Sequence, residues 1–192
     1  VVDPGFNAIL IRSCLDLAVL ADRFGDGPVA RRNRAFAERG LAALEDLWSE
    51  ADGQYLARDR IAGRLIDSRS VGGLIAAFAP IPTARAQAIA RRIETLAGRV
   101  GHLVPSHDPA DPRFDAKRYW RGPAWLIVNY MIADGLSVAG DTTIAERIRA
   151  DSIRLVTEAG FAEYYDPLTG APCGGGRFTW TAAMALELLE AT

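Results

Sequence analysis

The sequence predicts an all-α protein, a partial α/α toroid of about seven helices in alternating inner and outer pairs. Apolar residues recur with the period of a helix in seven segments, and turn residues separate them. More apolar segments alternate with amphipathic ones, as the inner and outer helices of a ring do. Each amphipathic segment precedes a loop of similar outline, which indicates an internal repeat of helix pairs. A superhelical solenoid of helix pairs is the alternative architecture.

Prolines and glycines mark most of the predicted helix ends. Pro4-Gly5 precedes the first helix, Pro28 suits the first turn of the second, and Pro80 and Pro82 end the third. The fifth helix is apolar almost all round, which predicts burial on most of its faces. Two short segments, 54–59 and 64–67, are candidates for a small hairpin. The predicted helices span residues 6–24, 29–48, 71–78, 83–99, 123–138, 142–159 and 179–189.

The composition is typical of an ordinary globular domain, and residues 1–192 read as a single domain without a linker. Of the 192 residues, 49% are hydrophobic and 24% are charged, which argues against global disorder. The formal net charge of −2 leaves no basic excess for binding nucleic acid or an anionic membrane. No apolar run is expected to reach the length of a membrane span. We therefore expect neither nucleic acid nor membrane as a partner.

The ends of the chain and its cysteines bear on where the protein works. Cys14 and Cys173 are far apart and do not make a disulfide framework, so a reducing, cytoplasmic compartment is the expectation. Val1-Val2-Asp3-Pro4 lacks a basic signal-peptide region and an initiator Met. We therefore expect a piece that was processed, trimmed or excised from a longer chain.

One stretch, Gly160 to Gly170, sets two acids among three aromatic rings. Asp166-Pro167 followed by Thr169-Gly170 predicts a tight turn. Carboxylates among rings on a rigid loop suit carbohydrate chemistry, where rings cover apolar sugar faces and acids move protons. The two carboxylates, Glu163 and Asp166, are the candidates for that proton transfer. The alternative is a solvated loop whose Tyr164 and Tyr165 pack on the helix ends.

A second aromatic segment precedes the apolar fifth helix. Its three rings can stack on sugar faces, and its two arginines can donate to hydroxyls or to a carboxylate. Its Gly122-Pro123 pair suits a helix start, whose positive dipole end would face a pocket. The alternatives are that Trp125 is a core residue and that Arg121 neutralises a nearby acid. The rings and arginines of this segment are Arg118, Tyr119, Trp120, Arg121 and Trp125.

Other polar motifs offer no cofactor site. His102 and His107 lack the spacing of metal ligands, and solvated or loop-pinning roles are the expectation. The run Gly174–Gly176 is no phosphate loop, because no strand precedes it and no Lys-Ser/Thr pair follows. Asn129 is either a hydrogen-bonded core residue or a substrate contact. We expect no metal and no cofactor. A sugar epimerase is a third, weaker alternative, because it would need histidines in the pocket and only His102 and His107 are available.

Together these segments resemble glycoside hydrolase family 63 and its trehalase-like relatives, most closely the bacterial mannosylglycerate and glucosylglycerate hydrolases. The resemblance covers essentially the whole chain and implies the C-terminal part of an (α/α)6 barrel, the six-hairpin glycosidase fold. It lies in residues 119–130, 161–170 and 178–183, and in the opening residues 3–10.

The resemblance implies inverting hydrolysis of an α-glycosidic bond in a small α-glucoside or α-mannoside. Glu163 falls on the family's general base, and Tyr119, Trp120 and Gly122 fall in the segment that lines the sugar site. Trp180 completes the expected pocket. The remaining expected contacts come from Arg118 or Arg121, Trp125 and Tyr164.

The family's general acid is an aspartate in an Asp-Asn-Ser-Pro-like run, and the chain contains no such run. We therefore expect the acid upstream of residue 1 and the isolated chain to be inactive. The alternative is a non-catalytic carbohydrate-binding or structural fragment. Seven helices, against about twelve in a closed toroid, leave apolar flanks unpaired, so self-association or a missing N-terminal segment is expected.

Overall fold

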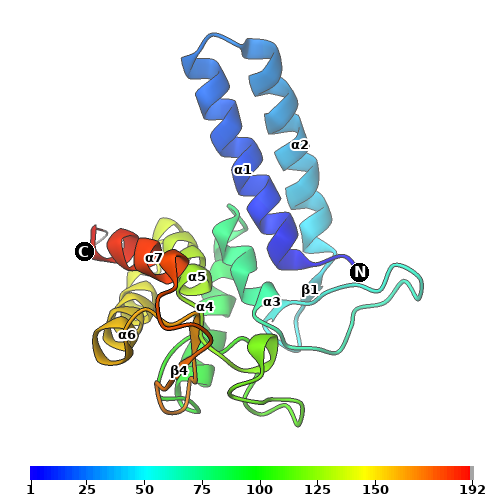
Figure 1. The fold of residues 1–192 in the computed structure, drawn as a ribbon. Helices are drawn as coiled ribbons and strands as arrows, with labels where there is room; N and C mark the ends of the chain where they lie inside the picture. Colours follow the sequence, from blue (N-terminus) through cyan, green and yellow to red (C-terminus); the bar gives the residue numbers. More distant parts are fainter. Residues whose placement is uncertain (191–192) are drawn as a thin grey trace.

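Helices dominate the protein, as the sequence predicts. The structure is a computed structural model that describes residues 1–190, and seven α-helices and two short 3-10 helices lie in that part (Figure 1). Two ribbons of two short strands each complete it. In chain order the elements are α1 (Pro4–Arg23), α2 (Gly27–Glu45), β1 (Trp48–Ser49), β2 (Gln54–Tyr55), α3 (Gly72–Ile75), η1 (Ala76–Phe78), α4 (Thr83–Ala97), η2 (Tyr119–Arg121), α5 (Leu126–Val138), α6 (Thr142–Ala159), β3 (Tyr164–Tyr165), β4 (Pro172–Cys173) and α7 (Thr179–Glu190).

Aspartate side chains begin three of the helices. Asp3 accepts a hydrogen bond from the N–H of Phe6 at 2.9 Å, at the start of α1. Asp26 and Asp141 cap α2 and α6 in the same way. Each carboxylate accepts from a backbone N–H that has no partner within the helix. Its negative charge is also stabilised by the positive end of the helix dipole. Asp3 is therefore a structural cap.

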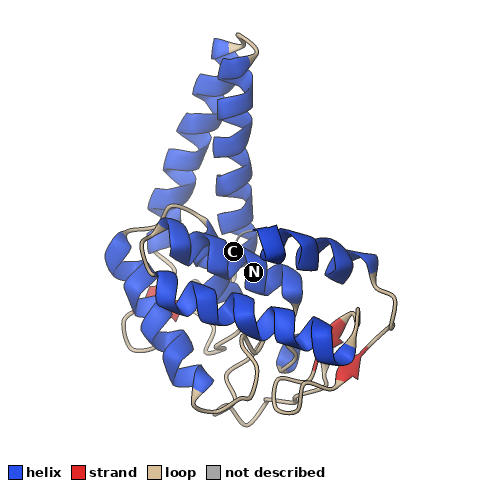
Figure 2. Ribbon diagram, turned by 90° about the vertical axis from the view of Figure 1, so that its left-hand side faces the viewer, coloured by secondary structure: helices blue, strands red, loops and turns tan. Residues whose placement is uncertain are grey.

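Helices α1 and α2 form a hairpin that projects from the rest of the molecule (Figures 1 and 2). Small side chains on one face of α1 let the two helices approach closely. Helix α5 is buried at the centre of the remaining helices, as its sequence predicts, and packs against η1, α6 and α7. At Gly135 a Cβ atom would lie 2.0 Å from the carbonyl oxygen of Ala77, so only glycine permits this approach of α5 to η1.

One expectation about apolar length is wrong. Among the described residues, helix α1 alone is long and apolar enough to cross a membrane by length and composition. Its small face packs on α2, and Arg12 pairs with Asp134 of α5 at 3.1 Å and with Asp16 at 3.3 Å. These are the contacts of a helix in a folded domain.

Three predicted boundaries also need correction. Strand β2 pairs with β1, so the hairpin predicted from 54–59 and 64–67 is reduced to a single bridge between Arg58 and Leu65. The third helix ends as α at Ile75 and continues as 3-10. The fifth begins at Leu126 and not at Pro123, because Ala124 pairs its backbone with Tyr165 instead.

The loops of the predicted repeat, residues 52–59, 101–108 and 160–166, lie at the end of the molecule away from the tip of the α1–α2 hairpin (Figure 1). The N–H groups of Gly101 and His102 both donate to the carbonyl oxygen of Pro167 at 2.9 Å, which joins the loops after α4 and α6. The N–H of Asp108 donates to the carbonyl oxygen of Arg69 at 3.1 Å, which joins the loops after α2 and α4. This end therefore offers one continuous loop surface.

Buried Asn129 holds the loop after α4 to the core. Its amide accepts from the N–H of Val104 at 2.9 Å and donates to the carbonyl oxygen of Leu103 and to the Ser152 hydroxyl, both at 2.8 Å. Both amide hydrogens and the amide oxygen of Asn129 thus have partners inside the core. Asn129 is a core residue, and the alternative of a substrate contact is excluded by its burial.

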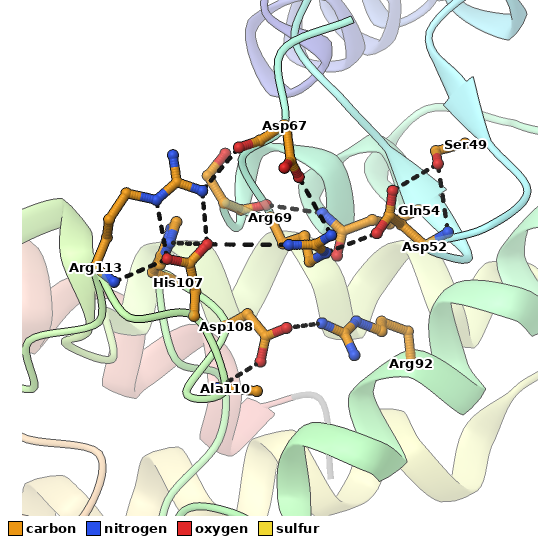
Figure 3. A network of polar contacts seen from close by, with 12 residues as sticks. Ser49, Asp52, Gln54, Asp67, Arg69, Arg92, His107, Asp108, Ala110 and Arg113 are labelled. Carbon is orange, nitrogen blue, oxygen red and sulfur yellow. Dashed lines mark hydrogen bonds and ion pairs between the residues drawn. The ribbon is translucent and has the colours of Figure 1, made fainter.

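An ionic network fastens the outer part of the same loop (Figure 3). Arg113 donates two hydrogen bonds to buried Asp111, at 2.6 and 2.9 Å, and Arg92 pairs with Asp108. Arg69 lies 2.6 Å from Asp52, on the loop after β1. The Arg113 guanidinium holds the pKa of the Asp111 carboxyl well below its usual range, although burial opposes that shift.

Both histidines lie in this loop region and both are buried, which leaves the loop-pinning role of the two that the sequence suggested. His107 Nε2 lies 3.3 Å from Asp111 Oδ2 without hydrogen-bond alignment. His102 Nδ1 lies 3.2 Å from the Arg154 guanidinium, and burial together with that cation lowers the pKa of His102. Both residues hold loops in place.

Replacing Asp111 by Asn should lower the free energy of unfolding at pH 7 by about 2 kcal/mol, because the Arg113 guanidinium then loses its buried carboxylate partner. That corresponds to a fall in Tm of roughly 4–8 °C. The folded-state pKa of Asp111 is depressed, so its stabilisation is complete above the unfolded value of about 3.9 and is lost as the pH falls below it. The difference in unfolding free energy between the wild type and Asp111→Asn should therefore decrease below about pH 4.

The matched control is Asp67→Asn, since Asp67 also pairs with Arg69 but its side chain is 82% exposed. We expect a change of less than about 0.5 kcal/mol. Thermal unfolding followed by circular dichroism from pH 7 to pH 2 measures both variants. A gap for Asp111→Asn that stays constant over that range would contradict the assignment.

Candidate active site

The start of α5 and the hairpin after α6 meet through backbone pairing. Ala124 and Tyr165 exchange two hydrogen bonds, at 2.9 and 3.0 Å, in an antiparallel bridge. Two residues before Tyr165, the N–H of Glu163 donates to the carbonyl oxygen of Gly175 at 3.1 Å. Glu163 therefore lies on a short, doubly held segment next to Trp125, the residue that precedes α5.

Four of the sequence-predicted rings form one cluster beside Glu163. Trp125 stacks between Trp120 and Tyr164, with ring centroids 4.4 and 4.8 Å away. Tyr119 meets the other three rings edge to face, at 4.8–5.8 Å. Trp125 is buried, whereas Tyr119 is 45% exposed and Trp120 is 49% exposed. The cluster thus presents aromatic surface to solvent, the kind of surface on which sugar rings stack.

Tyr119 ties this cluster to the acid. Its hydroxyl donates to Glu163 Oε1 at 2.8 Å, and that hydrogen bond raises the pKa of the Tyr119 phenol. The Tyr119 backbone has a φ of 37°, in the left-handed region that a bulky residue rarely enters. Strain of this kind is retained at functional sites when the surroundings enforce it.

Gly174 lies against the other side of the Glu163 carboxylate. It adopts a φ of +74°, and a Cβ atom there would lie 2.6 Å from both Glu163 Cβ and Glu163 Oε2. Both the backbone conformation and the space require glycine. The glycine run after β4 is therefore part of the wall that holds the acid.

Trp180 and the start of α7 form the opposite wall. One narrow crevice is lined by Glu163, by the first residues of α5 and by residues at the start of α7. Thr181 fixes this wall, because its hydroxyl donates to the carbonyl oxygen of Ala162 at 2.6 Å. The lining residues are Trp125, Leu126, Ile127, Glu163, Phe178, Trp180 and Thr181.

Arg121 and Gly122 contribute to the backbone around the site. Arg121 Nε donates to the carbonyl oxygen of Arg113 at 3.1 Å, and this is a contact with a carbonyl group and not with an acid. A Cβ atom on Gly122 would lie 2.2 Å from the carbonyl oxygen of Asp115. Asp166 is the turn residue that its sequence predicts, because its carboxylate accepts from the N–H of Leu168 at 2.8 Å.

No group of three or more His, Cys, Asp or Glu side chains within residues 1–190 is arranged to hold a metal ion. Neither His102 nor His107 lines the pocket that contains Glu163. The candidate chemistry of this site consequently rests on a carboxylate, a phenol and aromatic surface.

Comparison with known proteins identifies the family. The sequence model of the mannosylglycerate hydrolase MGH1-like glycoside hydrolase domain matches residues 1–181. The chain belongs to this family. Its relatives are glycoside hydrolases: a mannosylglycerate hydrolase of Thermus thermophilus is 42% identical over 187 residues, which is 97% of this chain and 45% of that protein. The resemblance seen in the motifs is thereby confirmed.

Solved structures agree on the fold of this MGH1-like domain. A family 63 mannosylglycerate hydrolase from Thermus thermophilus, solved in complex with glucose, superposes with a TM-score of 0.92 at 39% identity and covers 99% of this chain. This chain spans 48% of that structure, so just under half of its length. Neutral trehalase from Saccharomyces cerevisiae matches at a TM-score of 0.77 and 17% identity, which shows the shared fold alone.

Two residues at the site carry no obvious signal in the sequence. Gly174 stands in a glycine run that has no phosphate-loop context, and only the hairpin brings it to Glu163. Ser106 is buried beneath the Tyr119 turn, and its hydroxyl accepts from the N–H of Gly122 at 3.0 Å. No periodicity marks a single serine in a long loop, so the tertiary structure alone identifies it.

Gly174→Ala should lower the free energy of unfolding by about 2 kcal/mol, or roughly 4–8 °C in Tm, because alanine is strained at this φ and its methyl group meets Glu163. Gly175→Ala is the matched control, since a Cβ atom there has nothing within 4 Å. We expect the control to stay within about 0.5 kcal/mol. Equal effects in calorimetry would contradict the assigned contact.

Proposed function

We propose that this domain forms the base-bearing part of an inverting glycoside hydrolase that acts on a small α-glycoside, with Glu163 as the general base. The observation that carries the proposal is the hydrogen bond from the Tyr119 hydroxyl to Glu163 Oε1 at 2.8 Å, beside a partly exposed aromatic cluster. A carboxylate oriented by a phenol and next to a sugar-stacking surface can take a proton from water.

In this mechanism a water molecule attacks the anomeric carbon on the face opposite the leaving group. Glu163 accepts the proton from that water while the bond to the leaving oxygen breaks. A second carboxylic acid gives its proton to the leaving oxygen, so charge balances and the configuration inverts. Trp120 and Tyr119 present the ring surface for the sugar, and Trp180 stands across the pocket. Arg118 or Arg121 is proposed to orient the ligand at the rim.

The general acid is proposed to come from outside residues 1–192. Glu163 is the one carboxylate that lines its pocket in the described part of the chain. An inverting pair stands roughly 6.5–9.5 Å apart, with a water molecule between. A segment N-terminal to residue 1 would supply the partner, and residues 1–192 would then be the C-terminal domain of the barrel, inactive alone.

The proposed substrate is a glycosylglycerate or a similar small glucoside or mannoside. The family membership and the mannosylglycerate hydrolase activity of the Thermus relative support this class. A cytoplasmic location is proposed with it, and the two free cysteines, Cys14 and Cys173, support a reducing compartment.

The second candidate is a non-catalytic carbohydrate-binding or structural role. The exposed aromatic cluster favours sugar binding whether or not an acid partner is present. Measurements of hydrolysis and of sugar binding distinguish the two candidates, because only catalysis requires the Glu163 carboxylate.

Glu163→Gln in the full-length protein should lower kcat for hydrolysis of mannosylglycerate by about 10²–10⁴-fold, because the amide cannot accept the proton, while sugar binding persists. Glu146→Gln, on the exposed side of α6, is the matched control and should leave kcat unchanged. Steady-state kinetics and calorimetric binding measure the two effects. Full activity of Glu163→Gln would remove Glu163 from the mechanism.

We also propose that the outer face of α1 is covered in the working protein by a preceding segment, and that residues 1–192 alone self-associate through it. Apolar side chains repeat along that face at helical spacing and are 46–82% exposed. In sedimentation velocity the isolated chain should form dimers or larger species, and Leu10→Gln with Leu17→Gln should shift it to monomer. A monodisperse wild-type monomer would contradict this proposal. The face comprises Phe6, Leu10, Leu17, Leu20 and Phe24.

A further inference from the structure

The Tyr119 turn is closed from beneath by one buried serine. Ser106 is 1% exposed, and its hydroxyl accepts from the N–H of Gly122 at 3.0 Å and faces the carbonyl oxygen of Tyr119 at 3.5 Å. Its backbone N–H donates to the carbonyl oxygens of Gly122 and Pro123, both at 3.1 Å. One residue therefore contacts both ends of the turn from Tyr119 to Gly122.

This turn needs such support because its first residue is strained. Tyr119 is the one non-glycine residue with positive φ in the described part of the chain. A tyrosine keeps that conformation only where neighbouring groups enforce it. Two donors approach its carbonyl oxygen, the Ser106 hydroxyl at 3.5 Å and Trp125 Nε1 at 3.3 Å. The direction of the Tyr119 side chain, and hence its bond to Glu163, depends on this backbone conformation.

We propose that Ser106 is a positioning residue for the general base: its hydroxyl holds the Tyr119 turn in the conformation that brings the phenol to Glu163. The proposal rests on the function proposed above for Glu163. Ser106 touches neither Glu163 nor the space beside it and acts through Tyr119.

The backbone of Ser106 is anchored independently of its hydroxyl. Its carbonyl oxygen accepts from the N–H of Val71 at 3.0 Å, and its N–H is engaged with the turn. Removal of the hydroxyl alone therefore leaves the loop attached and loosens only the turn. This separates a positioning role from a general contribution to folding.

The kinetic test is a double-mutant cycle in the full-length protein. Ser106→Ala should lower kcat about 10-fold with KM changed less than about twofold, because the base is misdirected while sugar contacts remain. In the Tyr119→Phe background the same change should cost nothing further, since the phenol through which it acts is absent. Equal losses in both backgrounds would overturn the proposal.

Ser152→Ala is the matched control. Ser152 is also fully buried, and its hydroxyl accepts from Asn129 and donates to the carbonyl oxygen of Ile148, both at 2.8 Å, so it makes no hydrogen bond with the turn itself. It should lower Tm without lowering kcat. Ser106→Cys keeps the size of the side chain with a weaker hydrogen-bonding group, and it should shift kcat in the same direction as Ser106→Ala. Ser106→Cys replaces Ser106→Ala in the experiment if Ser106→Ala does not fold.

A second measurement does not depend on catalysis. With tyrosines labelled at Cζ by carbon-13 and Tyr119→Phe used for assignment, nuclear magnetic resonance follows the titration of the Tyr119 phenol. Its pKa is raised by the bond to Glu163, so Ser106→Ala and Glu163→Gln should both lower it toward the ordinary value of about 10, whereas Ser152→Ala should not. An unchanged titration in Ser106→Ala would overturn the proposal even if hydrolysis is never detected. Absent hydrolysis with the expected titration would count against the proposed function alone.

Discussion

Two backbone hydrogen bonds between Ala124 and Tyr165 join the start of α5 to the hairpin that follows α6, and the candidate site is built around that joint. Because the pairing uses main-chain atoms, it fixes the distance between the two segments whatever side chains they carry. Trp125 and Tyr164, one on each side of it, therefore stack, and Glu163 is held beside the same rings. Because of this pairing α5 begins at Leu126 and not at Pro123, and Leu126 and Ile127 line the same narrow crevice as Glu163.

The loop after α4 supplies the other half of the site, and polar groups rather than apolar packing hold it. Asn129 binds its beginning to the core, and the arginine–aspartate network with Asp108 and Asp111 binds its middle. Leaving any of these buried groups unpaired is costly, so the contacts oppose other arrangements of the loop. A strained residue such as Tyr119, at the end of the loop, persists only where neighbouring contacts enforce its conformation.

The residues at the site are of two kinds: side chains that are exposed to solvent at the site, and glycines that leave space for them. Tyr119 and Trp120 offer exposed rings, and Glu163 offers the carboxylate. Glycines make room for these groups: Gly174 lies against the acid, and Gly122 lies against the backbone of Asp115. Under the proposed function, such a site would recognise sugars by shape and stacking more than by charge. This is consistent with membership of a family of glycoside hydrolases.

The sequence by itself determined the helices, their inner and outer alternation, the turn at Asp166 and the two aromatic segments, because helical periodicity and turn chemistry are local properties. It placed Glu163, Tyr119, Trp120, Trp125 and Tyr164 near one another only through resemblance to a family. Tertiary structure decided what local patterns cannot encode. It moved the start of α5 to Leu126 because Ala124 pairs with Tyr165, buried both histidines, and brought Ser106 to the Tyr119 turn and Gly174 to Glu163. The physical reason is that these contacts join segments far apart in sequence, where backbone pairing and space, and not residue type, select the partner.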